Sequence, residues 1–167
     1  FHYTLGEAEG STSAGNSAKT LQPAVVVTQR GTGGTLTFGA ATGPGTDSLT
    51  AATFTRASAG NGKYLATTEL YEGTYTLYDE NLVLEAWYST AAATKQTIVE
   101  LSNNTGSRLM LYVTATGKLA AQLFLPDQAV STATVTGTTT VSDGATRHAR
   151  VEVTKDGKHV VTMKPEK

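Results

Sequence analysis

The 167-residue sequence contains no cysteine, one tryptophan and four prolines. Without cysteine, neither a disulfide framework nor a thiolate metal site can form. No apolar run approaches the roughly 20 residues that a membrane-spanning helix needs. Charged residues make up 16% of the chain and the formal net charge is -1, so there is no strong field to steer nucleic acid or an anionic membrane. We therefore expect neither a nucleic-acid partner nor membrane insertion.

The chain is rich instead in small and β-branched residues. It has 17 glycines, and 39% of its residues are hydrophobic. Threonine is frequent and suits the solvent-facing positions of strands, whereas glycine suits turns. At this length one domain is the default, and a real core can be buried. The composition favours a single all-β domain over residues 1–167.

The stretch 81–89, NLVLEAWYS, has the clearest alternation. It places Leu82, Leu84, Ala86 and Tyr88 on one face of a strand and Val83, Glu85 and Trp87 on the other. Later strands repeat the pattern with three inward-facing sets: Leu109, Leu111 and Val113; Leu119, Ala121, Leu123 and Leu125; Ala149, Val151 and Val153. Turn signals separate these short strands, and no segment is convincingly helical. The pattern predicts a β-sandwich.

The pattern before residue 81 is weaker. We expect a short strand at 35–38, followed at 39–46 by an exposed loop with the sequence GAATGPGT. Strands at 49–56 and 63–67 flank Gly60-Asn61-Gly62, which is a hairpin-type signal.

Four segments of the chain occur in a family-like order: FHYTLGEAEGSTSAGNSA, NLVLEAWYST, RLMLYVTATGKLAAQL and TVTGTTTVSDGATRHARVEVTKDGKHVVTM. This order resembles the laminin G-like jelly-roll family, within the concanavalin A-like group of sandwiches. The segments are similar to the family's first strand and loop, its strand ending in Glu-Ala-Trp, its long hairpin, and its His-containing strand. The resemblance implies a jelly-roll β-sandwich of two antiparallel sheets.

The chain departs from that family at two places. Thr146 stands where the family usually has a tryptophan, and the family's last strands would follow Lys167. The sequence also begins at Phe1 and shows no signal peptide. We therefore expect part of a larger polypeptide or assembly, in which the domain either is abbreviated or is completed by strands from elsewhere.

The carboxylates and histidines do not support catalysis. Glycan hydrolysis needs two carboxylates that flank the scissile bond, and related glucanases carry them on one strand as Glu-x-Asp-x-x-Glu. Glu85 stands alone on its strand, and Glu69 and Glu72 lack the central aspartate. His148 lies on the outward face of its strand, where a cross-strand pair is its ordinary role. We expect a protein that is not an enzyme.

The segment 69–80 is the candidate binding site. Its Tyr71, Tyr75 and Tyr78 have rings that stack on sugars or fill the pockets of a protein partner. Their other interpretation is packing on the flank of the sandwich. Trp87 is expected to be a packing anchor, because a tryptophan in mid-strand usually lies in a core.

Four carboxylates of the same segment are candidate calcium ligands: Glu69, Glu72, Asp79 and Glu80. The family resemblance implies one Ca²⁺ at the rim of the sandwich. Calcium takes about six to eight oxygen ligands, and the spacing of an EF-hand loop is absent. The other interpretation is an acidic loop that faces water. No other cofactor is expected.

The resemblance and the absence of a catalytic pair favour a non-catalytic binding or adhesion module. Its partner would be a glycan or a protein, and its location extracellular or on a virion surface. The alternative is a structural or accessory module of a phage virion or tail-like assembly. In that case the chain would form a homo-oligomer or share a strand with a neighbour.

Overall fold

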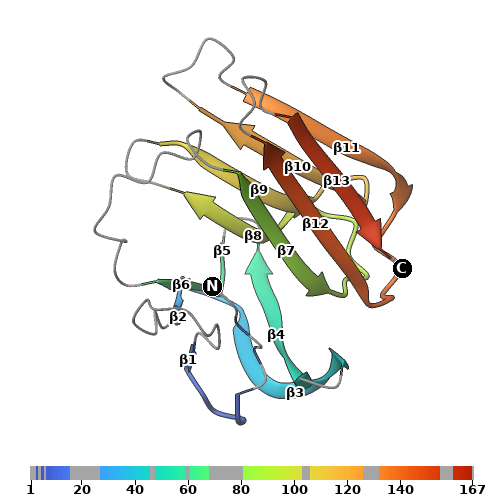
Figure 1. Ribbon diagram of the computed structural model, residues 1–167. Helices are drawn as coiled ribbons and strands as arrows, with labels where there is room; N and C mark the ends of the chain where they lie inside the picture. Colours follow the sequence, from blue (N-terminus) through green and yellow to red (C-terminus); the bar gives the residue numbers. More distant parts are fainter. Residues whose placement is uncertain are drawn as a thin grey trace. The chain divides into compact units, whose positions relative to one another are not determined.

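The computed structural model is all-β, and no helix occurs in the part of the chain that it describes (Figure 1). It describes residues 3, 5, 7–15, 27–45, 48–58, 61–67, 81–102, 106–125, 132–154 and 160–166. The chain divides into two compact units, residues 1–71 and 72–167. The all-β class is confirmed, whereas the jelly-roll topology and the single domain stay predictions.

The first unit contains two three-stranded antiparallel sheets. Its strands are β1 (Ser13–Ala14), β2 (Val27–Arg30), β3 (Thr35–Gly45), β4 (Ser48–Ser58), β5 (Asn61–Gly62) and β6 (Tyr64–Thr67). One sheet has the order β1-β2-β6 and the other β3-β4-β5. The core is small: the buried residues are Ala14, Val27 and Phe38, and the partly buried residues against them are Tyr3, Leu5, Leu36, Ala52 and Leu65.

The expected loop at 39–46 is wrong, because β3 continues to Gly45. Its backbone pairs with β4 at Ala41–Ala51, Thr42–Thr50 and Gly45–Ser48, after a register shift that follows Thr37. Gly39 lies within this shift and has a φ of 73°, which a residue with a side chain rarely adopts. Strand pairing uses the backbone, so a glycine-rich run of low β-propensity still forms a strand beside a partner.

The expected hairpin around Gly60-Asn61-Gly62 is also wrong in its pairing. The chain does turn back on β4 there, but through the two-residue strand β5. The next strand, β6, pairs with β2 from Val27–Thr67 to Arg30–Tyr64. The glycine-containing turn signal therefore correctly predicted where the chain reverses direction, but it did not predict which strand β6 pairs with.

The second unit is a sandwich of two antiparallel sheets. Its strands are β7 (Leu82–Tyr88), β8 (Gln96–Ser102), β9 (Arg108–Val113), β10 (Lys118–Phe124), β11 (Thr132–Thr140), β12 (Arg147–Thr154) and β13 (Val160–Glu166). One sheet has the order β11-β10-β9-β8 and the other β13-β12-β7. In Figure 1 the second of these sheets lies in front of the first.

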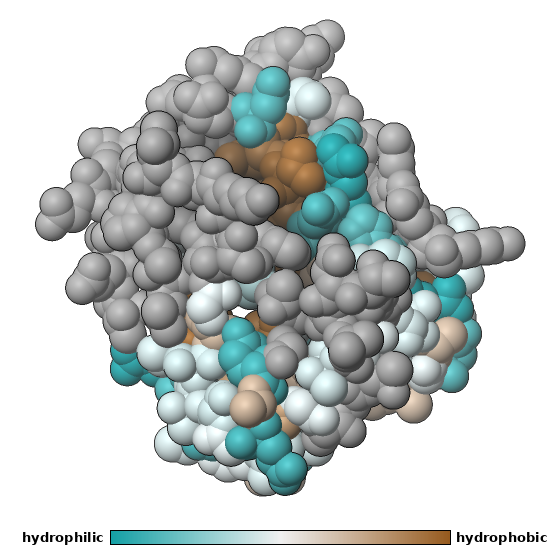
Figure 2. Space-filling model, turned by 60° about the horizontal axis from the view of Figure 1, so that its bottom comes forward, coloured by the Kyte–Doolittle hydropathy of each residue, from teal (hydrophilic) through white to brown (hydrophobic). Residues whose placement is uncertain are grey.

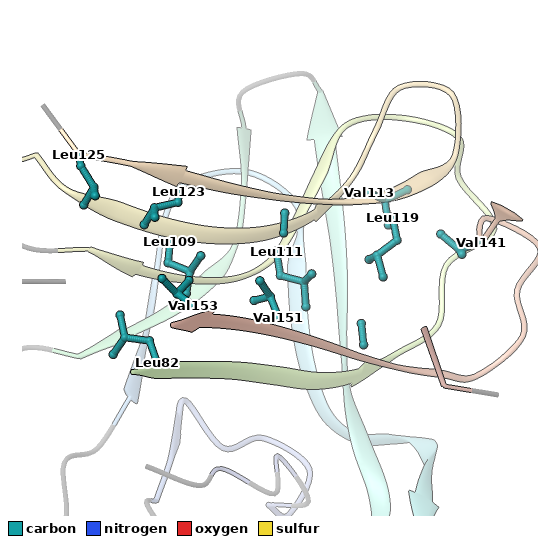
Figure 3. Packing of buried hydrophobic residues seen from close by; sticks show 12 residues of the cluster. Leu82, Leu109, Leu111, Val113, Leu119, Leu123, Leu125, Val141, Val151 and Val153 are labelled. Carbon is teal, nitrogen blue, oxygen red and sulfur yellow. The ribbon is translucent and has the colours of Figure 1, made fainter. Parts of the chain in front are cut away.

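Aliphatic side chains from both sheets fill the space between them (Figure 3). The buried members are Leu82, Leu109, Leu111, Val113, Leu119, Ala121, Leu123, Leu125, Val141, Ala149, Val151 and Val153. They include every residue of the three inward-facing sets that the sequence predicted. A strand presents alternate residues to opposite faces, so burying these sets fixes which side chains of β7 and β12 face away from the core.

Candidate functional site

The residues first selected for binding lie outside the described part of the chain. These are Tyr71, Tyr75 and Tyr78 and the proposed calcium ligands Glu69, Glu72, Asp79 and Glu80. Their roles stay predictions. The candidate site that the structure does describe lies on the next strand, β7, and on its neighbour β12.

The outer β7–β12 face is made by six side chains that point away from the sandwich core. They are Val83, Glu85 and Trp87 from β7 and His148, Arg150 and Glu152 from β12. The antiparallel register places them in three cross-strand pairs: Trp87 with His148, Glu85 with Arg150 and Val83 with Glu152. Paired side chains on one face of a sheet are direct neighbours, so these six form one continuous surface.

Trp87 is not a packing anchor, and that expectation is wrong. Its residue is 53% exposed, and Val83, four positions earlier on the same face, is 52% exposed. The alternation of β7 explains the result, because burying Leu82 and packing Leu84 and Tyr88 against the core send the odd-numbered residues outward. Figure 2 shows one face of the molecule, on which a patch of hydrophobic residues lies beside hydrophilic ones.

The ring of Trp87 rests against that of His148. The two ring centroids are 4.9 Å apart and the planes meet at 38°. His148 Nε2 also lies 3.6 Å from Glu85 Oε2, and the side chain of His148 is only 14% exposed, whereas that of Glu85 is 56% exposed. The imidazole of His148 is therefore largely buried between the exposed ring of Trp87 and the exposed carboxylate of Glu85. The predicted outward position of His148 is confirmed.

Arg150 and Glu152 form an ion pair along β12. Arg150 stands directly opposite Glu85 in the register, but its Nη2 donates to the carboxylate of Glu152. Its Nε is buried, and it finds no hydrogen-bond partner among the residues that the structure describes. The arginine is thus held by its strand neighbour, and Glu85 keeps an exposed carboxylate.

Sequence reasoning missed the cross-strand partners of Glu85 and Trp87. It treated Glu85 as an isolated carboxylate, but the register brings Glu152 onto the same face, one position diagonal to it. Two carboxylates on an open sheet face do not make an acid–nucleophile pair by themselves, since catalysis also needs a scissile bond held between them. The absence of enzymatic activity stays a prediction.

Among the described residues, no three side chains of histidine, aspartate or glutamate gather in a way that could hold a metal ion. A hollow of about 320 Å³ lies along β11 and is lined by Leu119, Val135, Thr136, Gly137, Thr138, Thr139 and Val141. It arises where the β10–β11 register shifts between Lys118 and Ala120. None of those lining residues is ionisable, whereas the outer β7–β12 face has charged side chains that could bind a ligand. We therefore take this face as the candidate site.

Hydrogen bonds tie the loop before β12 to the end of β7. Ser89 Oγ donates to the carbonyl of Gly144 at 2.8 Å, and the Gly144 N–H donates to the carbonyl of Thr90 at 2.9 Å. Within the loop, Asp143 accepts from Arg147 Nη2 at 2.6 Å and from the Ala145 N–H at 3.1 Å. These contacts hold the two strands in register next to Trp87 and His148.

The Arg147 side chain, followed by the Ala145 N–H, lowers the pKa of Asp143 below its ordinary value of 3.8. A carboxyl with a lowered folded-state pKa stabilises the fold above its unfolded pKa, and this contribution disappears as the pH falls through the lowered value. We expect an NMR titration of the Asp143 carboxyl to give a pKa below 3.8. Arg147→Gln should return it toward the ordinary value; an unchanged pKa in that variant would contradict the assignment.

Comparisons with protein families, with curated proteins and with solved structures found no match to this chain. The resemblance to laminin G-like jelly rolls therefore stays a prediction that rests on the four quoted segments. No helix in the described ranges has the length and apolar character needed to span a membrane.

Proposed function

We propose that this chain is a non-catalytic binding module that holds a glycan on the outer β7–β12 face. The observation that carries the proposal is the exposure of Trp87 on the outer face of the sheet. A tryptophan ring is large, and leaving half of it in water forgoes much of the stabilisation that its burial would bring. A ligand that covers the ring would recover that stabilisation.

The surroundings of the ring suit a sugar. A pyranose has an apolar C–H face, which packs on an aromatic ring, and a rim of hydroxyls, which need donors and acceptors. Glu85, His148, Arg150 and Glu152 supply such groups around Trp87. The contact with His148 also restricts the indole before the ligand arrives, which lowers the entropy cost of binding.

The face is long enough for more than one sugar unit. Val83 and Trp87 are four residues apart on β7, which corresponds to about 13 Å along a strand. Apolar contacts are thus available at both ends of the face, with Glu85 and Arg150 between them. This arrangement favours a short oligosaccharide that lies along β7.

A glycan array followed by calorimetry on the sugars that bind tests the proposal. Trp87→Ala should weaken binding by about tenfold or more, taking as a guide the roughly 1–3 kcal/mol that an aromatic side chain contributes when a nucleic-acid base stacks on it. Trp87→Phe should retain part of the affinity because it keeps an aromatic face.

Tyr64→Ala is a matched control, because Tyr64 is 54% exposed but belongs to the first unit. It should bind glycans as the parent protein does. Wild-type affinity in Trp87→Ala, or an array without a binding glycan, would overturn the proposal and favour a protein partner or the structural role.

A further inference from the structure

We infer that the glycan on the outer β7–β12 face carries a free amino group, so that the ligand is an oligosaccharide of amino sugars. The inference rests on the proposed function, because it places the sugar on Trp87. It is carried by the pairing of an exposed aromatic ring with an exposed carboxylate, Glu85, on the same strand face.

Among the described residues, no lysine or arginine forms an ion pair with the exposed carboxylate of Glu85. The cation opposite it, Arg150, is held by Glu152. In the described part of the chain, the ion-pair partner of Glu85 is His148 Nε2 at 3.6 Å, a distance longer than a normal hydrogen bond. The carboxylates of Glu85 and Glu152 and the guanidinium of Arg150 carry formal charges that sum to -1.

The spacing of Glu85 and Trp87 matches the size of one sugar unit. Two residues along a strand correspond to about 7 Å, and both side chains leave the same face of β7. An ammonium group on a sugar stacked over Trp87 lies within reach of the Glu85 carboxylate. A cation near an indole face gains a second attraction from the ring quadrupole.

The same charges disfavour an acidic sugar. A carboxylate or sulfate on the ligand would meet Glu85 beside the ring, and like charges at this distance repel. Arg150 compensates less than a lone guanidinium would, because its Nη2 is bound to the Glu152 carboxylate. The face therefore selects cationic over anionic glycans.

Glucosamine oligomers and N-acetylglucosamine oligomers of equal length form a matched pair of ligands for calorimetry. They share the sugar ring and differ in the charge of the nitrogen. The parent protein should bind the amino oligomer about tenfold more tightly, through the carboxylate and the ring together. Added salt should reduce this preference, because the pair is exposed to solvent.

Glu85→Gln should reduce the preference to the smaller part that the Trp87 ring supplies, while leaving the affinity for the acetylated oligomer unchanged. Glu100→Gln is the control, since Glu100 is an exposed carboxylate on β8 of the other sheet; it should keep the preference. Trp87→Ala should weaken the binding of both oligomers.

Each outcome separates this inference from the proposed function. Equal or tighter binding of the acetylated oligomer, or a preference that Glu85→Gln does not reduce, overturns the amino-sugar assignment and leaves the glycan module standing. A failure of both oligomers to bind also overturns it. An oligolysine peptide that binds as tightly as the amino oligomer would show that charge alone is recognised, which overturns it too. Binding that is indifferent to Trp87→Ala overturns the proposed function itself.

Discussion

Replacing Leu111 with alanine should lower the free energy of unfolding by about 2–5 kcal/mol, the range for truncating a fully buried leucine. Leu111 has no exposed surface and lies on β9, where its side chain packs between the two sheets (Figure 3). Its cross-strand neighbours are Val99 of β8 and, on the other side, Ala121 of β10. An alanine there is too small to fill the space that the substitution leaves, so the cavity would persist.

Urea unfolding followed by fluorescence and circular dichroism measures this loss. The midpoint should fall while the slope stays constant, since the surface exposed on unfolding is nearly the same. Leu111→Met, which conserves volume, should cost less than about 1.5 kcal/mol. Val83→Ala, on the outer face, should change the stability by about 0.5 kcal/mol or less. Equal losses in Leu111→Ala and Val83→Ala would contradict the assignment of inner and outer faces.

The division into inner and outer faces could be read from the second half of the sequence. In β9, β10 and β12 one face is almost wholly aliphatic, so a period of two identifies the buried side chains without knowledge of the partner strands. The same period also placed Trp87 on the face of Val83 and Glu85. The expectation that Trp87 is buried failed because it followed the usual preference of tryptophan rather than its position in the strand.

Strand partners could not be read in the same way. The pairing of β6 with β2 joins segments that are separated by β3, β4 and β5, and local sequence carries no record of such a contact. The candidate site depends on the same kind of information. The sequence alone places Glu85 and Trp87 on one face of the same strand. Only the pairing with β12 shows that His148 contacts the Trp87 ring and that Arg150 is bound to Glu152.

Rigidity of the outer β7–β12 face follows from the core below it. Leu82 on β7 and Ala149, Val151 and Val153 on β12 are buried, so the backbone positions of the outward residues are fixed by packing. The loop around Asp143 adds hydrogen bonds at one end. A site on paired strands is held more precisely than one on a loop, which suits recognition by a ring and a charge at fixed spacing.

Replacing Gly34 with alanine should destabilise the first unit by roughly 2–5 kcal/mol, from two causes that act together. Gly34 has a φ of +67°, and an added Cβ would lie 2.0 Å from the backbone oxygen of Thr55. The next residue, Thr35, pairs with Thr55, and the two hydroxyl oxygens are 2.6 Å apart. Relieving the clash would separate β3 from β4 where their pairing begins.

Substitutions at two other glycines of the first unit distinguish the cost of the positive φ from the cost of the contact with Thr55. Gly10 has a φ of +86° with nothing within 4 Å of an added Cβ, so Gly10→Ala should show only the conformational cost, about 1–2 kcal/mol. Gly15 has the same open space without a positive φ, so Gly15→Ala should be close to neutral. Hydrogen exchange at the amides of β3 and β4 would localise the loss. If Gly34→Ala were no worse than Gly10→Ala, the close approach of Gly34 to Thr55 would have to be abandoned, since the two variants share the strained φ and differ only in that contact.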